Sequence, residues 1–158
     1  MATIRYLRGD ATQPQATGPR IIAHICNDQG GWGQGFVAAL SKRWGGPEAA
    51  YRSWYQDRQG NDFGLGALQL VPVEPALWVA NLVAQHGDRA TSEGPPIRYE
   101  AVRTCLRKLA PEAAERGASV HMPRIGCGLA GGSWEAIEPI ISDELTSKGI
   151  EVTVYDFG

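Results

Sequence analysis

The sequence has no long apolar run and no excess of charge of either sign. Nowhere does it approach the roughly 18 consecutive apolar residues of a membrane-spanning helix. Its opening, MATIRYLRGDA, lacks the apolar core of a signal peptide. The formal net charge is -2, and the Lys and Arg residues are scattered, so no basic patch for DNA or RNA is expected. We therefore expect a cytoplasmic protein without membrane contact or direct nucleic-acid binding.

Cysteine is scarce as well. Cys26, Cys105 and Cys127 are far apart, and none belongs to a C-x-x-C pair of the kind that binds zinc. This spacing predicts reduced thiols, no metal site and no metal cofactor. Cys127 lies in a glycine-rich segment, where a small side chain that fills a tight loop is favoured over a nucleophile.

The remaining composition is typical of a globular protein. Hydrophobic residues make up 43% of the chain and charged residues 20%. A chain of 158 residues can bury a core without disulfide bonds. We expect one domain over residues 1–158, and a monomer.

Apolar patterning predicts alternating strands and helices. Strands are expected at 3–8, 19–26, 66–73, 76–85, 118–125 and 150–157. Helices are expected at 36–44, 47–58, about 99–115 and 134–149, with a polar surface loop at 86–96. Pro111 is expected to kink or split its helix, Pro139 to bend the last helix, and Ser133 to cap it. Such alternation favours a three-layer α/β domain.

Two glycine-rich loops each follow a predicted strand and precede a predicted helix. They are GGWGQGF at 30–36 and GCGLAGG at 126–132. A strand end followed by a helix N-terminus directs unpaired N–H groups at a bound anion. One such loop commonly holds one phosphate, so two indicate a diphosphate. The alternative, that both are ordinary turns, stays open.

Both loops also match the dinucleotide-binding fingerprint, as Gly126-x-Gly128-x-x-Gly131 and, in its alanine variant, Gly33-x-Gly35-x-x-Ala38. The later match lies too near the end of the chain for a second βαβ unit to follow. The earlier match is followed at a suitable distance by Asp57, which falls in a polar helix. These contexts disfavour a nicotinamide-dependent dehydrogenase.

Four segments together resemble the macrodomain family, whose members bind ADP-ribose. They are YLRGDAT, IIAHICNDQGGWGQGFVAALSKRWGG, MPRIGCGLAGGSWE and EVTVYDF, which span nearly the whole chain. The branch that the chain most resembles includes the terminal ADP-ribose protein glycohydrolase and the yeast-type ADP-ribose 1″-phosphate phosphatase. The resemblance implies an α/β/α fold with a central mixed sheet and a cleft at the strand ends. It also implies ADP-ribose as ligand or product, ADP-ribosylated proteins as partners, and no further cofactor.

The resemblance assigns ligand-binding roles along the cleft. Asp10, with Ala11 beside it, would accept a hydrogen bond from the adenine amino group. Tyr155 and Phe157 are two apart on a strand and so share one face, where they would flank the adenine or simply pack on the sheet. One side of the diphosphate would contact Gly31, Trp32, Gly33, Gln34, Gly35 and Phe36. The other phosphate and the distal ribose, near Asn27, would contact Gly126, Cys127, Gly128, Leu129, Ala130 and Gly131.

The chain departs from the glycohydrolase at two positions. Gln85 stands where the family enzyme has its nucleophilic lysine, and Ala130 stands where it has an assisting aspartate. Neither an amide nor a methyl group can replace those functions. A water positioned near the distal ribose could act instead, and the polar candidates to hold it are Asn27, Asp28, Gln85 and His24, with the substrate's own phosphate as a possible base. His24 lies in an apolar strand, so a structural role in the core is its alternative.

These residues favour a hydrolase that removes ADP-ribose from modified acidic side chains through a positioned water. One alternative is a non-catalytic reader or scavenger of ADP-ribose, because the family lysine and aspartate are missing. Another is a phosphatase acting on ADP-ribose 1″-phosphate.

Overall fold

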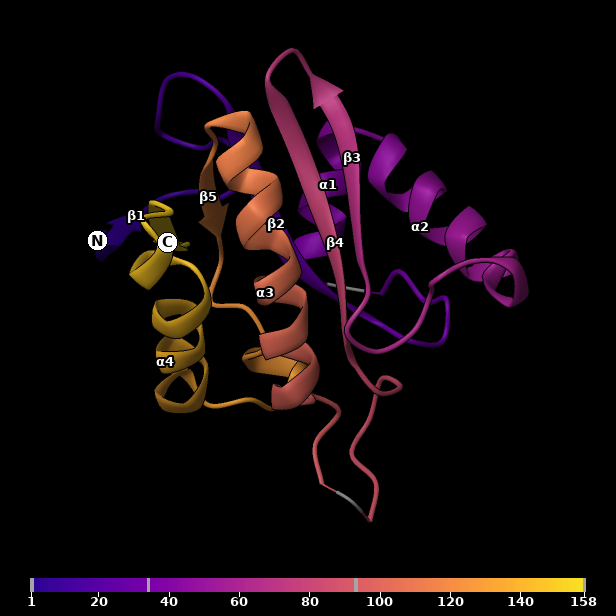
Figure 1. Ribbon diagram of the computed structural model, residues 1–158. Helices are drawn as coiled ribbons and strands as arrows, with labels where there is room; N and C mark the ends of the chain where they lie inside the picture. Colours follow the sequence, from indigo (N-terminus) through magenta and orange to yellow (C-terminus); the bar gives the residue numbers. More distant parts are fainter. Residues whose placement is uncertain (1, 34, 93, 158) are drawn as a thin grey trace.

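The computed structural model describes residues 2–33, 35–92 and 94–157 and shows one mixed sheet between two layers of helices (Figure 1). Over that part of the chain the sheet has six strands in the order β1-β6-β5-β2-β4-β3. They are β1 (Ile4–Arg8), β2 (Arg20–Asn27), β3 (Leu68–Glu74), β4 (Leu77–Gln85), β5 (Ser119–Met122) and β6 (Val152–Asp156). β3 runs antiparallel to β4, and the other neighbours pair in parallel. The expected α/β/α architecture with a mixed sheet is confirmed.

The helices fall close to their predicted positions. They are α1 (Phe36–Arg43), α2 (Gly46–Gln56), α3 (Tyr99–Arg116) and α4 (Trp134–Glu144), with short 3₁₀ turns at Arg58–Gly60, Gly128–Ala130 and Thr146–Lys148. In the described residues, no helix is long and apolar enough to cross a membrane.

Two predicted helix features differ from the structure. Helix α3 continues through Pro111, because that residue is exposed while the flanking Leu109 and Ala113 are fully buried and hold the helix against the core. Helix α4 stops at Glu144 rather than at residue 149, because a 3₁₀ turn follows and ends at Gly149 with φ of 83°. Ser133 does occupy the N-cap position of α4, but its side chain makes no capping hydrogen bond.

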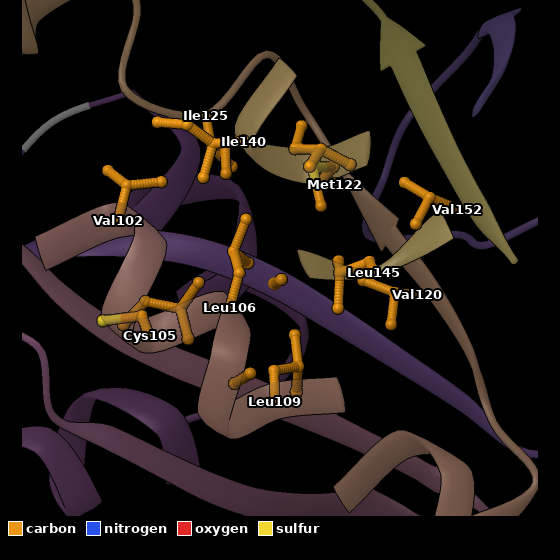
Figure 2. Packing of buried hydrophobic residues seen from close by; sticks show 14 of the residues in the cluster. Val102, Cys105, Leu106, Leu109, Val120, Met122, Ile125, Ile140, Leu145 and Val152 are labelled. Carbon is orange, nitrogen blue, oxygen red and sulfur yellow. The ribbon is translucent and has the colours of Figure 1, made fainter. Parts of the chain in front are cut away.

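Each face of the sheet carries its own core. Alternate residues of β2 point to opposite faces of the sheet. Ile21 packs towards α3 and α4, and Ile22 packs towards α1 and α2. Figure 2 shows the larger core, where side chains from α3, β5, α4 and β6 meet, among them Leu106 and Met122. Because helices pack on both faces of the sheet, the strand ends between the two layers are held in position.

Parallel strands bring their carboxyl ends to one edge of the sheet. The two glycine-rich loops follow β2 and β5, and the long loop between β4 and α3 projects beyond the same edge (Figure 1). In open α/β sheets, ligands bind at this edge. The fold thus brings together segments that are about 100 residues apart in the sequence.

Candidate functional site

A cleft runs along the edge where the parallel strands end. It consists of three adjoining cavities of about 320, 370 and 330 Å³, here named the first, second and third cavity. The first and second share Phe36 and Pro123 in their walls. The second and third share Ile25 and Gln85. Together they form an elongated site suited to an extended ligand.

Asp10 lies in the wall of the first cavity, with one carboxylate oxygen fixed and the other open. Oδ1 accepts hydrogen bonds from the backbone N–H of Thr12, at 2.8 Å, and from its hydroxyl, at 2.7 Å. Among the described residues, Oδ2 has only a loose ion pair with Arg43, at 3.8 Å. The carboxylate is therefore oriented by its neighbour, and Oδ2 can accept a hydrogen bond from a ligand.

Two aromatic residues also line the first cavity, in different ways. Tyr155 is buried, and its hydroxyl is held 2.7 Å from His121 Nδ1 and 2.8 Å from the backbone nitrogen of Gln15. Phe157 is 86% exposed. Tyr155 thus offers a rigid ring surface, whereas the Phe157 ring is free to pack on a ligand.

The glycine-rich loops present bare backbone to the cleft. A β-carbon built on Gly33, Gly35 or Gly128 would meet no atom of the described residues within 4 Å. Gly35 and Gly128 have φ of 82° and 69°, which glycine adopts without strain. Gln34, predicted to bind the ligand, lies outside the described residues.

The second loop closes on itself. The N–H of Gly132 donates to the carbonyl of Gly126 at 2.8 Å, which folds the 3₁₀ turn Gly128–Ala130 into a compact ring. Leu129 lies in this turn. The predicted residues of this loop that line the second cavity are Gly126, Cys127, Gly128 and Ala130, and Gly131 does not line the cleft.

Asn27 is in the wall of the third cavity, but its amide holds the first loop together. Oδ1 accepts from the N–H groups of Gln29 and Gly31 and from the hydroxyl of Tyr51, at 2.9, 3.2 and 2.9 Å. Nδ2 donates to the carbonyl of Gly31 at 3.1 Å. Asn27 therefore shapes the loop that would face a ribose.

Gln85 stands between the second and third cavities. Its Nε2 donates to the carbonyl of Gly87 at 2.9 Å, so the amide is oriented with Oε1 as its remaining acceptor. Ala130, at the position of the family aspartate, is 6% exposed and supplies only a methyl group.

His24 lies beneath the second cavity and is 2% exposed. Its Nε2 is 2.5 Å from Oδ1 of Asn81, and its Nδ1 has no partner among the described residues. Burial lowers the pKa of His24 to about 4, against the opposing effect of the Asn81 hydrogen bond. The imidazole is thus neutral at pH 7.

Asp28, also a predicted polar candidate, does not line the three cavities. Its Oδ1 accepts from the N–H of Gly87 at 2.9 Å, and its Oδ2 lies 2.7 Å from Nδ1 of His86. The carboxylate therefore links the end of β2 to the loop after β4.

Trp32 is packed into the wall of the cleft. It is 8% exposed, and its Nε1 donates to the hydroxyl of Ser41 at 2.8 Å. Its ring packs against those of His24 and Tyr51, with centroids 5.3 and 5.6 Å away. Trp32 thus forms part of the wall of the third cavity.

The environment of Cys127 does not activate its thiol. Burial raises the pKa of Cys127, and the nearby Arg124 only partly offsets this. A thiol that stays protonated is a poor nucleophile and a poor metal ligand. The described residues contain no group of three or more His, Cys, Asp or Glu side chains that could hold a metal ion.

Several residues that line the cleft were not predicted from the sequence. Ile25, Val37 and Ala39 are apolar residues within elements, and nothing local distinguishes them from core residues. Asp88 lies in the polar stretch 86–96, which the sequence marks only as a surface loop, yet it lines the third cavity. Its position directly after the strand that ends at Gln85 was the available signal.

The chain is similar to several known proteins, although no family model matches it. A macrodomain protein structure from Streptomyces coelicolor is 60% identical, with a TM-score of 0.88, and the match covers 99% of this chain and 100% of that one. The chromodomain-helicase-DNA-binding protein 1-like of Danio rerio is 35% identical over 161 residues, which is 96% of this chain but only 15% of that protein. An ADP-ribose 1″-phosphate phosphatase of Lodderomyces elongisporus is 27% identical, covering 98% of this chain and 99% of that protein. With this fold, this cleft and these relatives, the chain belongs to the macrodomain family.

Proposed function

We propose that this chain binds ADP-ribose and hydrolyses the ester bond that joins ADP-ribose to a modified acidic side chain. The observation that carries the proposal is the three-cavity cleft, which has an open carboxylate oxygen at one end, bare backbone in the middle and polar amides at the other end. These three regions correspond in order to a base, a diphosphate and a distal ribose.

The first cavity supports adenine recognition. Oδ2 of Asp10 can accept a hydrogen bond from an exocyclic amine, which adenine has and which hypoxanthine lacks. The rings of Tyr155 and Phe157 provide the surfaces on which a planar base can stack.

The middle of the cleft supports diphosphate binding by backbone groups. Helix α1 begins at Phe36, directly after Gly35, so its first N–H groups have no partner inside the helix. Arg124 is the one cationic side chain that the described part of the chain contributes to the walls, and Asp156 already binds it at 2.6 and 3.0 Å. Backbone dipoles would therefore carry most of the interaction with the diphosphate.

The third cavity supports cleavage of an ester without a protein nucleophile. Asn27 and Gln85 offer amides, and no described lysine or arginine lines this cavity. A carboxylate is a good leaving group, so positioning of a water can supply much of the acceleration. A terminal phosphate dianion would meet Asp88 in the same cavity with no cation in its wall, which disfavours the phosphatase reaction named for the yeast relative.

A non-catalytic reader is the second candidate. It is favoured by the amide at position 85 and the methyl group at position 130, since neither side chain can form a covalent adduct. Both candidates bind ADP-ribose, and only the hydrolase releases it repeatedly.

The test is turnover on a glutamate-ADP-ribosylated protein held in molar excess over the enzyme. We expect several molecules of free ADP-ribose per protein molecule, and no phosphate release from ADP-ribose 1″-phosphate. Tight binding of ADP-ribose without any release would establish the reader, and no binding at all would overturn the proposal.

Gly33→Ala tests whether the cleft is the binding site. A β-carbon at Gly33 meets no atom of the described residues within 4 Å, so the fold should be unchanged, whereas it would occupy space in the third cavity. We expect ADP-ribose affinity to fall about tenfold or more by calorimetry. Gly60→Ala is the matched control, because Gly60 is equally unhindered but lies away from the cleft, and its affinity should equal that of the wild type.

A further inference from the structure

A water that attacks the distal ribose needs a group to take its proton, and the polar residues predicted from the sequence do not supply one. His24 is 2% exposed beneath the second cavity. Asn27 and Gln85 carry amides, which are not bases. Both oxygens of Asp28 are occupied, by Gly87 and by His86.

Asp88 is a carboxylate in the right part of the cleft. It lines the third cavity together with Asn27, Gly31 and Gln85. Of the described residues that line the second and third cavities, it is the only acidic one. Its side chain is 67% exposed, so water can reach it.

The backbone that presents Asp88 is held by a set of hydrogen bonds. The N–H of Asp28 donates to the carbonyl of Gln85 at 2.9 Å, and the N–H of Gly87 donates to Asp28 Oδ1 at 2.9 Å. The Gln85 amide donates to the carbonyl of Gly87, also at 2.9 Å. Gly87 has φ of 68°, a turn that glycine makes easily. The first residues of this projecting loop, immediately before Asp88, are therefore anchored to β2.

Asp88 also has a free oxygen. Its Oδ1 lies 3.5 Å from Nε of Arg89 in an exposed ion pair. Across the described residues, Oδ2 has no ion-pair partner. An ionised carboxylate with an unoccupied oxygen beside the distal end of the cleft has the properties of a general base.

We propose that Asp88 is the general base of the reaction, an inference that rests on the proposed hydrolase function. Asp88 accepts one proton from water as the water oxygen bonds to the anomeric carbon of the distal ribose. The bond from that carbon to the ester oxygen breaks, and its electron pair leaves on the glutamate carboxylate. The proton then passes from Asp88 to solvent, so the products are ADP-ribose, the free carboxylate and one proton.

The decisive variants are Asp88→Asn and Asp88→Glu, assayed for turnover on glutamate-ADP-ribosylated protein and for ADP-ribose binding. We expect Asp88→Asn to lower kcat by about 100-fold or more, the usual contribution of a general base, and to change the ADP-ribose Kd less than twofold. Asp88→Glu should recover part of the rate. Asp57→Asn, the same change at the end of α2 and away from the cleft, should match the wild type.

Each other outcome has a distinct meaning. If the wild type turns over and Asp88→Asn keeps kcat within threefold of it, the assignment of Asp88 is overturned and the hydrolase function stands. If Asp88→Asn loses rate only in proportion to lost ADP-ribose binding, Asp88 is a binding residue and the assignment also fails. If the wild type releases no ADP-ribose, the proposed function and the assignment fall together.

Discussion

The Nε2 atom of His24 and the Oδ1 atom of Asn81 lie 2.5 Å apart between β2 and β4. Asn81 Nδ2 donates to the carbonyl of Pro47 and to Oε1 of Gln69, at 3.2 and 2.9 Å. Because these bonds make Oδ1 the acceptor, the hydrogen between the two side chains belongs to His24 Nε2. Burial lowers the pKa of His24 to about 4, so its imidazole is neutral with Nδ1 unprotonated beneath the cleft, and protonation would place a charge in the core.

The two buried neutral histidines, His24 and His121, predict a loss of folding stability in mild acid. Burial lowers the pKa values of His24 and His121 to about 4, below the ordinary value of 6.5 that applies when the chain unfolds. As pH falls from 6.5 towards 4, the unfolded chain gains protons that the folded chain excludes, so folding becomes less favourable. Each histidine can contribute on the order of 3 kcal/mol across this interval. Urea unfolding at pH 7.5, 6 and 5 measures the effect.

His121→Gln serves as the control for this pH dependence. The variant should have a shallower fall in the free energy of unfolding between pH 6.5 and 5, whatever its stability at pH 7.5. An unchanged slope in this variant would show that His121 titrates normally in the folded protein.

Local sequence signals identified much of the fold and part of the cleft. Strands such as 76–85 and helices such as 47–58 were predicted to within about two residues, because their apolar periodicity is set by one buried face. The glycine-rich loops and Asp10 were identified because their motifs are contiguous. The helix is not split at Pro111, because packing of the residues around it keeps α3 continuous.

What the sequence could not reveal depends on contacts between distant segments. Asp28 and His86 are 58 residues apart, and their contact removes Asp28 from the set of available acids. The amide of Asn27 is equally committed to its own loop and to Tyr51. The chemistry of a side chain can be inferred from its residue type. Whether its polar atoms are available to a ligand depends on hydrogen-bond partners that only the folded chain supplies.

The ion pairs of Glu144 predict a second loss of folding stability, at lower pH. It is 6% exposed and pairs with Arg107, Arg103 and Lys148. The hydrogen bond from Arg107 is the main reason that the pKa of Glu144 is lowered to about 2 from 4.5. The stabilisation is therefore complete above pH 4.5 and is lost as pH falls towards 2.

Glu144→Gln should lower the free energy of unfolding at pH 7 by about 1–2 kcal/mol. Asp143→Asn, which affects only an exposed pair with Arg103, should change it by less than about 0.5 kcal/mol.

Gly132→Ala should damage the second glycine-rich loop. A β-carbon there would collide with the carbonyl oxygen of Gly126, a backbone atom that cannot swing away. The same oxygen accepts the N–H of Gly132, so relieving the collision breaks the hydrogen bond that closes the ring. We expect the free energy of unfolding to fall by about 1–3 kcal/mol and ADP-ribose affinity to fall with it. Wild-type stability in this variant would show that the loop rearranges freely.

Phe157→Ala should separate ligand binding from stability. Phe157 is 86% exposed and lines the first cavity, so its removal should leave the unfolding midpoint unchanged while the loss of stacking weakens ADP-ribose binding by about 1–3 kcal/mol. Tyr155→Phe should do the opposite. It keeps the ring but leaves Gln15 N–H and His121 Nδ1 without the hydroxyl, which costs about 1–3 kcal/mol of stability and little affinity. Calorimetric binding and thermal unfolding of both variants measure the two effects. If Phe157→Ala binds ADP-ribose as the wild type does, the adenine does not stack on Phe157, and Asp10 and the ring of Tyr155 must account for recognition of the base.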